Sequence, residues 1–204
     1  MDNNYIVIAN LSKGQLGEHH ANLLGSLLIA SFGSAAMTRS DIPQHERKDF
    51  AMIIDEFPNY TTTALASLLS EARKYGLSLI LAHQYLDQMA DEVRDAVLGN
   101  VGSMVVFAVG AQDADVFGRE LNLPPKMVVD TWPYEARCRI LDNDQIYLLT
   151  PPPPKAHGHR QKIIAYSRMH YGTERASIEA RIERALSSNS KEKPAESRSR
   201  KSTW

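Results

Sequence analysis

Short apolar runs alternate along most of this chain with longer segments of helical periodicity. A run of four to eight residues rich in Val, Ile and Leu and bounded by turn residues indicates a buried strand, because a strand covered on both faces needs no polar side. Four runs of this kind predict strands at 5–9, 50–54, 77–82 and 103–108. Apolar residues three and four positions apart predict helices at 21–38, 61–75, 86–98 and 111–121.

This alternation of strands with helices predicts an α/β fold, a doubly wound sheet of mostly parallel strands. Near the end of the pattern, 136–141 and 145–149 predict a hairpin across the turn Asp142-Asn143-Asp144. The α/β body is expected to end near Thr150, which makes 1–150 the first predicted domain.

The composition changes after Thr150. Four consecutive prolines, Pro151 to Pro154, predict a stiff linker, and a helix is expected from Arg175 to Leu186, so 151–187 is a linker followed by a C-terminal helix. From 188 to 204 the chain contains almost no apolar residues, which predicts disorder. We interpret this basic tail as a solubilising end, with weak contact to DNA or to an acidic partner as the alternative.

One stretch raises the question of a membrane span. Ala21 to Thr38 carries no charge and reaches the length at which a spanning helix is considered. Three serines, one Asn and two glycines interrupt its apolar surface. A buried helix packed on a sheet explains this composition better than a transmembrane helix does.

The overall composition excludes several classes of protein. The 204 residues are 43% hydrophobic and 23% charged, with a formal net charge of -1, which is typical of a globular domain and excludes a polybasic nucleic-acid binder. The single Cys138 excludes an internal disulfide framework and a Cys-rich zinc site, and it fits a reducing cytosol.

The strongest candidate chemistry lies at the end of the second predicted strand, in the sequence FAMIIDE. A buried strand places Asp55 and Glu56 at the carboxyl edge of a parallel sheet, where α/β folds bind ligands. In nucleotide hydrolases an Asp at this position holds Mg²⁺ and the next Glu orients the attacking water. The alternative is an Asp that caps the following turn beside an exposed Glu.

Two further side chains fit the same chemistry. Gln84 follows the next strand and would lie beside the two carboxylates, where it could contact a γ-phosphate; the alternative is a loop residue without a role. Arg73 lies near a helix end, where it could offset the helix dipole or reach a phosphoryl group across a subunit boundary.

Several ordered segments resemble one known family. NLSKGQLGEHHANLLGSLL, SDIPQHERKDF, AMIIDEFPNY, LLSEARKYGLSLILAHQYL and EVRDAVLGNVGSMVVFAVGAQDADVF are similar to FtsK/HerA-type ATPases. They are more similar to the TraG/TraD-like coupling ATPases of conjugative DNA transfer and type IV secretion. The resemblance extends from about Tyr5 to Leu149 and more loosely into the C-terminal helix.

The resemblance implies a RecA-like hexameric motor that uses ATP and Mg²⁺ to move DNA through a central channel. By resemblance, Asp55 is the Walker B ligand of Mg²⁺, Glu56 the catalytic Glu, Gln84 the sensor and Arg73 an arginine finger acting in trans. It also implies other type IV secretion components as partners, and a cytoplasmic location, at the inner face of the membrane if the missing part or a partner anchors it.

One required motif is absent. A P-loop needs G-x-x-x-x-G-K-[ST], and none of the 11 glycines is followed by Lys. In the family this motif lies upstream of the matched region, so the chain resembles the C-terminal half of the motor, with an incomplete sheet that lacks the P-loop strand. We expect marginal stability, association through the exposed sheet edge or dependence on the N-terminal P-loop half.

Two alternatives to a motor fragment stay open. The chain could be a catalytically inactive α/β module that binds partner proteins or DNA in such a system. It could also be an ATPase completed by a separately encoded P-loop half. The reading frame upstream of Met1 discriminates between a fragment and a stand-alone module.

Overall fold

A computed structural model describes residues 1–141 and 146–191 of the chain. The chain divides into two compact units, Met1–Pro152 and Pro153–Trp204. The first unit contains every described strand, and the described part of the second unit contains only helices α7 and α8.

The elements follow the predicted alternation of helices and strands. In chain order they are α1 (Lys13–Leu16), α2 (Glu18–Met37), η1 (Thr38–Asp41), η2 (Gln44–Glu46), β1 (Phe50–Ile54), η3 (Phe57–Tyr60), α3 (Thr63–Glu71), η4 (Ala72–Tyr75), β2 (Leu77–Leu81), η5 (Leu86–Gln88), α4 (Asp91–Asn100), β3 (Ser103–Val106), α5 (Ala111–Glu120), α6 (Pro125–Val129), β4 (Glu135–Ile140), β5 (Ile146–Leu149), α7 (Arg160–Tyr171) and α8 (Arg175–Lys191).

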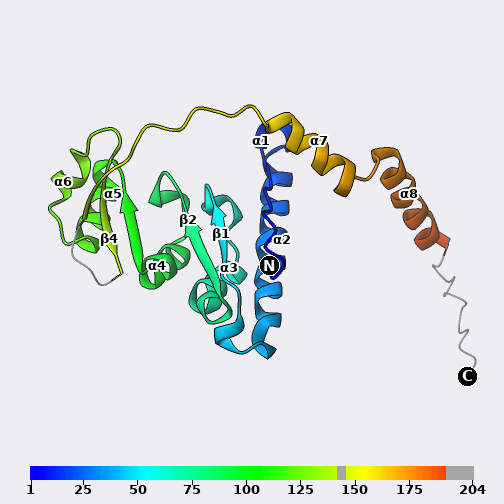
Figure 1. The fold of residues 1–204 in the computed structure, drawn as a ribbon, viewed down its shortest axis with the longest axis horizontal. Helices are drawn as coiled ribbons and strands as arrows, with labels where there is room; N and C mark the ends of the chain where they lie inside the picture. Colours follow the sequence, from blue (N-terminus) through cyan, green and yellow to red (C-terminus); the bar gives the residue numbers. More distant parts are fainter. Residues whose placement is uncertain (142–145, 192–204) are drawn as a thin grey trace, which may run out of the picture. The chain divides into compact units, whose positions relative to one another are not determined.

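Strands β1 and β2 form a parallel two-stranded sheet, in register from Phe50 opposite Leu77 to Ile54 opposite Leu81. Helices α2 and α3 pack beside this sheet (Figure 1). The connection from β1 through α3 to β2 is the strand–helix–strand unit that the hydrophobic pattern predicts, since parallel neighbours need a crossover.

Strands β3, β4 and β5 form a second sheet in which both pairs are antiparallel. The β4–β5 pair confirms the predicted hairpin strands, whereas the turn predicted at 142–144 lies outside the described residues. The fold is therefore α/β as predicted, but parallel pairing among the described strands is limited to β1 and β2.

Strands β2 and β3 each keep one unpaired edge within the described part of the chain. β2 pairs only with β1, and β3 pairs only with β4. A single hydrophobic core nevertheless unites the two sheets, because it contains Met52 and Leu77 from the first and Met104 and Val106 from the second. The interruption between β2 and β3 confirms that the sheet is incomplete.

Helix α2 confirms the predicted apolar helix and packs through small side chains. Its buried residues are Ala21, Gly25, Ile29, Gly33 and Ala36, which recur about every four residues and form one stripe. Glu18–Asp41 is the one helical segment, among the described residues, that is long and apolar enough to cross a membrane. A single helix of this kind is weak evidence for a span, because the core helix of a soluble protein passes the same test.

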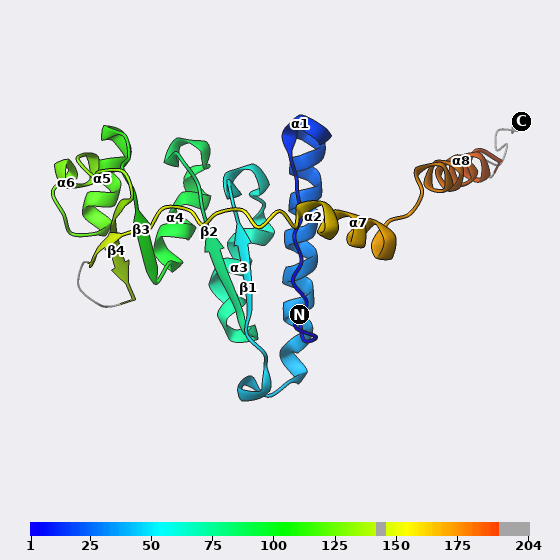
Figure 2. The same cartoon turned by 45° about the horizontal axis from the view of Figure 1, so that its top comes forward.

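The predicted strand at 5–9 is wrong in this structure. Residues 5–9 have no regular secondary structure, and the side chains of Tyr5, Ile6, Val7 and Ile8 are 59–89% exposed. Figure 2 shows this N-terminal segment running beside α2. An apolar run records a preference for burial, but a strand also requires ladder hydrogen bonds, which this segment does not form with β1.

Three predicted boundaries also move. The helix predicted at 61–75 tightens into η4 for its last turn, and the helix predicted at 86–98 is divided because Met89 and Ala90 are extended. α8 continues to Lys191, four residues into the segment for which disorder was predicted; 192–204 lie outside the described residues. The short helix α6 was not predicted, because five residues are too few to show periodicity.

Candidate functional site

Asp55 and Glu56 lie where β1 ends, at the carboxyl edge of the parallel sheet. The ladder continues one step past the strands: the Ala82 amide donates to the Ile54 carbonyl at 3.0 Å, and the Phe57 amide donates to the Ala82 carbonyl at 3.2 Å. These two bonds hold the loops that follow β1 and β2 against each other. Both carboxylates therefore stand on a fixed backbone.

The backbone at Glu56 is left-handed, with φ 50° and ψ 44°, an uncommon conformation for a residue other than Gly. The Glu56 amide donates to Asp55 Oδ1 at 3.1 Å, and both the amide and the side-chain nitrogen of Asn59 donate to the Glu56 carbonyl. These contacts stabilise a sharp turn, so Asp55 is exposed while Glu56 is half-buried. Strained backbone that its surroundings hold in place is common at functional sites.

Gln84 follows β2 at the same edge as the two carboxylates. Because Ile54 and Leu81 are opposite each other in register, Asp55 and Gln84 leave neighbouring strand ends on the same side of the sheet. Gln84 is exposed in the described structure. The structure thus places Asp55, Glu56 and Gln84 at one edge, as the sequence predicts, without a direct contact between Gln84 and either carboxylate.

His83 is a half-buried neighbour of these residues that sequence reasoning missed. Its ring is 5.4 Å from the Phe57 ring, edge to face, and 6.5 Å from that of Phe117 on α5. Burial lowers the pKa of the His83 imidazole below its ordinary value, while the Tyr85 backbone and the carboxylates of Asp113 and Glu56 act in the opposite direction. His83 therefore links the end of β2 to the α5 side of the unit.

The signal for His83 was weak in the sequence. It stands between a strand and the more conspicuous Gln84, and only the fold brings Phe57 and Phe117 against it. Its Nδ1 atom is buried without a hydrogen-bond partner in the described structure.

A cavity of about 870 Å³ opens beside β1. The N-terminal residues 4–13 form one wall, β1 forms another, and residues of α2 between Gly25 and Phe32 complete it. One end is polar, where Lys13 donates to Asn59 Oδ1 and to Glu18 Oε1, each at 2.8 Å. Asp55 and Glu56 line this same cavity.

Arg73 lies at the opposite end of the sheet from the two carboxylates. It is exposed in η4, directly before β2 begins, and a five-residue strand spans about 16 Å. The structure therefore does not bring Arg73 together with Asp55, Glu56 and Gln84. Within one chain, Arg73 cannot act on a group bound at the carboxyl edge.

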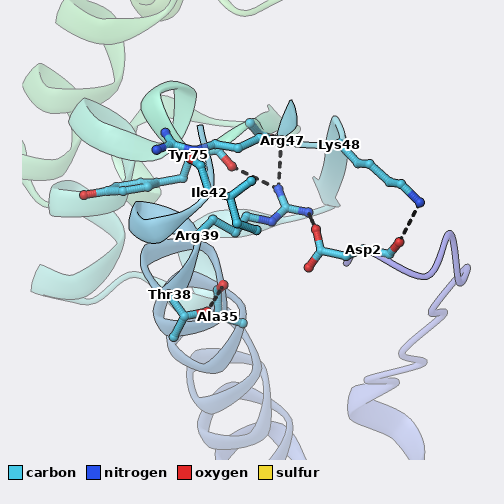
Figure 3. A network of polar contacts seen from close by, with 9 residues as sticks. Asp2, Ala35, Thr38, Arg39, Ile42, Arg47, Lys48 and Tyr75 are labelled. Atoms are coloured by element: carbon cyan, nitrogen blue, oxygen red, sulfur yellow. Dashed lines mark hydrogen bonds and ion pairs between the residues drawn. The ribbon is translucent and has the colours of Figure 1, made fainter. Parts of the chain in front are cut away.

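Two arginines fix the turn that carries Arg73 (Figure 3). The buried Arg39, 2% exposed, donates to the Tyr75 carbonyl at 2.9 Å and to Asp2 Oδ1 at 2.8 Å. Arg47 donates to the Lys74 carbonyl and lies over the Tyr75 ring. The backbone next to Arg73 is thus held by side chains from the end of α2 and the loop after it.

The carboxyl edge can hold a magnesium ion only together with other ligands. No group of three or more His, Cys, Asp or Glu residues suited to a metal occurs in the described part of the chain. Mg²⁺ usually keeps several waters and takes one or two protein carboxylates plus substrate phosphates. Asp55, exposed and hydrogen-bonded on one oxygen only by the Glu56 amide, fits that limited role.

Comparison with known proteins identifies part of the chain by sequence. Residues 49–119 match the family model described as the TraM recognition site of TraD and TraG. This region extends from the residue before β1 to α5 and contains all four predicted site residues. No curated protein matches the chain.

Solved structures share the fold at low sequence identity. The bacterial conjugative coupling protein TrwBdeltaN70, in an unbound form, matches 63% of this chain with 12% identity and a TM-score of 0.56. The plasmid coupling protein TrwB in complex with the non-hydrolysable GTP analogue GDPNP matches 64% with 15% identity and a TM-score of 0.54. The chain spans 37% of each of these two proteins.

The family match covers β1, β2 and the residues that follow them, and the structural matches extend over nearly two thirds of the chain. Over residues 49–119 the chain is similar to the TraM recognition site of TraD and TraG, and in its α/β fold it is similar to the conjugative coupling protein TrwB.

Proposed function

We propose that this chain supplies one half of the ATP site of a DNA-translocating motor for conjugative transfer or type IV secretion. The observation that carries the proposal is the arrangement of Asp55, Glu56 and Gln84 at one sheet edge, next to the unpaired side of β2. The P-loop half, which would hold the nucleotide phosphates, comes from outside this sequence.

Each edge residue takes a separate role in this proposal. Asp55 holds Mg²⁺, which neutralises charge on the phosphates when it is bound. Glu56, held by the turn that Asn59 stabilises, orients the attacking water and accepts its proton. Gln84 contacts the γ-phosphate or that water from the neighbouring strand end.

The unpaired edges of β2 and β3 support the proposal that a P-loop strand belongs between them. β2 offers a free edge on one side of the interruption and β3 on the other, although one core unites their two sheets. Unpaired strand edges readily pair with another chain segment. A P-loop strand inserted between them would place its phosphate-binding loop beside Asp55 and Gln84.

Arg73 requires a second subunit. Since it lies about 16 Å from the carboxyl edge of its own sheet, one strand length away, it can only serve an ATP site on a neighbouring copy. This geometry supports a ring of subunits, a hexamer in the proposed motor, in which each subunit completes the next site. DNA and other type IV secretion components are the partners of that assembly, at the cytoplasmic face of the inner membrane.

The test begins with the reading frame upstream of Met1. If it encodes an in-frame G-x-x-x-x-G-K-[ST], the longer chain is purified and its Mg²⁺-dependent ATP hydrolysis is measured with and without DNA. Glu56→Gln should lower turnover about 10²–10⁴-fold, as expected for the loss of a general base. Glu92→Gln removes an exposed carboxylate on α4 and should leave turnover unchanged. Equal turnover in both variants would contradict the role of Glu56.

A second candidate function is a partner-binding module without catalysis. It is favoured by the absence of a Gly-Lys dipeptide and by the description of the matching family model as a recognition site. A stop codon directly upstream, together with no ATP hydrolysis by the chain alone or mixed with a separately encoded P-loop protein of the same system, would favour this function. Hydrolysis that appears only in the mixture would instead indicate an ATPase completed in trans.

A further inference from the structure

The two units carry opposite charge. Residues 1–152 contain eleven Lys and Arg and nineteen Asp and Glu, whereas residues 153–204 contain twelve and five. The overall charge of -1 therefore conceals an acidic first unit and a basic second unit. Such asymmetry is typical of proteins with a segment that contacts a polyanion.

The part of the second unit without acidic residues includes α7 and the segment before it. From 146 to 173 the sequence has four Lys and Arg, three His and no Asp or Glu. The four cations are Lys155, Arg160, Lys162 and Arg168, and all four side chains are exposed without an ion pair among the described residues. On α8, by contrast, Arg175 pairs with Glu179 at 2.6 Å.

Aromatic side chains lie among these cations. The rings of Tyr166 and His170 stack at a centroid distance of 3.9 Å, and Tyr166 and Tyr171 are 57% and 74% exposed. α7 buries none of its residues. Exposed rings between unpaired cations offer faces for bases next to charges for phosphates, which is how proteins bind single-stranded nucleic acid.

We infer that α7, together with Lys155, binds single-stranded DNA. The inference rests on the proposed function for its biological setting, and it adds a DNA contact outside the ATP site. A membrane surface is less favoured, because charged side chains interrupt the apolar ones around the helix. Arg160 lies between Ile163 and Ile164, and Lys162 lies between Tyr166 and Met169. A second copy's acidic first unit is less favoured for the same reason, since protein docking uses an apolar centre.

The test measures binding of fluorescein-labelled dT20 to the full chain by fluorescence anisotropy, without nucleotide, at several NaCl concentrations. The variant Arg160→Gln/Lys162→Gln/Arg168→Gln should weaken binding at least tenfold. It should also lower the slope of log K against log salt by about 2, because each phosphate that a cation neutralises adds about 0.7 to that slope. Tyr166→Ala should weaken binding about tenfold, and Tyr166→Phe should restore it.

The matched control removes the same charge from the next helix. Arg175→Gln/Arg181→Gln/Arg184→Gln changes the net charge equally and should alter affinity less than threefold. Because α7 buries no side chains, circular dichroism should show the same fold in all variants. The assay needs no ATP hydrolysis, so a chain that binds dT20 but never hydrolyses ATP would keep this inference while contradicting the motor.

Four results would overturn the inference. Equal weakening in the two triple variants would show non-specific attraction to the whole basic unit. Tighter binding to duplex DNA of the same length would contradict the stacking role of Tyr166. If the unaltered chain bound phosphatidylserine vesicles but not dT20, and the α7 triple variant lost that vesicle binding, the helix would be assigned to a membrane. If the α7 triple variant lost self-association in sedimentation while its dT20 binding stayed unchanged, the helix would be assigned to a second copy.

Discussion

The two units of the chain use apolar residues in opposite ways. In the first unit the side chains of Phe57, Leu65 and Val128 are completely buried, within a core built by both sheets and the helices beside them. In the second unit Ile178, Ile182 and Leu186 recur at helical spacing, yet they are 41–66% exposed. Helical spacing therefore places these apolar side chains on one face of α8. Their burial would need an opposing surface, which the described part of the second unit does not contain.

The largest expected effect is the loss of stability when a buried leucine of the first unit is truncated, compared with an exposed leucine of the second unit. Leu65→Ala should destabilise the first unit by about 2–5 kcal/mol, because truncation of a buried Leu removes packed atoms and leaves a cavity. Leu186→Ala removes the same atoms from a side chain that is 66% exposed and should change stability by less than about 0.5 kcal/mol. Urea unfolding followed by circular dichroism measures both. Equal destabilisation would show that the second unit packs in solution.

The next effect concerns the buried cation Arg39 of the first unit. Arg39→Met keeps much of the side-chain volume but leaves the Tyr75 carbonyl without its donor, and should cost about 1–3 kcal/mol. Asp2→Asn keeps an oxygen that accepts from Arg39 and removes only the charge of a half-exposed side chain, so it should cost less. If the Asp2 variant were the less stable of the two, the ion pair and not the carbonyl bond would fix the turn next to Arg73.

A pH dependence should also distinguish the first unit. Because burial lowers the pKa of His83, the folded chain binds its proton less readily than the unfolded chain does. The contribution of His83 is thus complete above the unfolded pKa, near 6.5, and is lost as pH falls below it toward the folded pKa. Thermal unfolding between pH 8 and 5 should show this loss, and His83→Gln should flatten it. An unchanged profile in the variant would assign the pH dependence to other groups.

The smallest effect is expected in the second unit. Arg175→Ala breaks the pair with Glu179 on α8, where the arginine side chain is 91% exposed. An exposed i,i+4 pair contributes about 0.3–0.5 kcal/mol to a helix, so the helical signal at 222 nm should hardly fall. A large loss of helicity would mean that α8 depends on this pair and is only marginally stable alone.

The sequence anticipated the candidate site better than its surroundings. The strands that precede Asp55 and Gln84 were predictable, because apolar runs bounded by polar residues follow from burial on both faces of a parallel sheet. His83 was not predictable as a neighbour, since its contacts with Phe57 and Phe117 join residues 26 and 34 positions away in the chain. The roles of Asp55, Glu56, Gln84 and Arg73 stay predictions.

The failures have a common physical origin. Residues 5–9 have the composition of a buried strand, yet pairing depends on an edge that must meet them in space. The helix predicted at 86–98 is interrupted because local periodicity does not record where Leu86 and Met89 must turn inward to the core. In both cases a tertiary contact, and not the local pattern, decides the outcome.

By itself, the sequence determined the alternation of strands and helices, the position of the acidic pair after a buried strand, the absence of a P-loop and the basic character of the C-terminal part. These properties depend on residue type and spacing along the chain. Only the tertiary structure decided that residues 5–9 stay unpaired, that Arg73 lies one strand length from the carboxylates, and that α7 leaves its cations unpaired. These depend on which distant segments meet, and hydrogen-bonded edges and buried contacts fix that only in the folded chain.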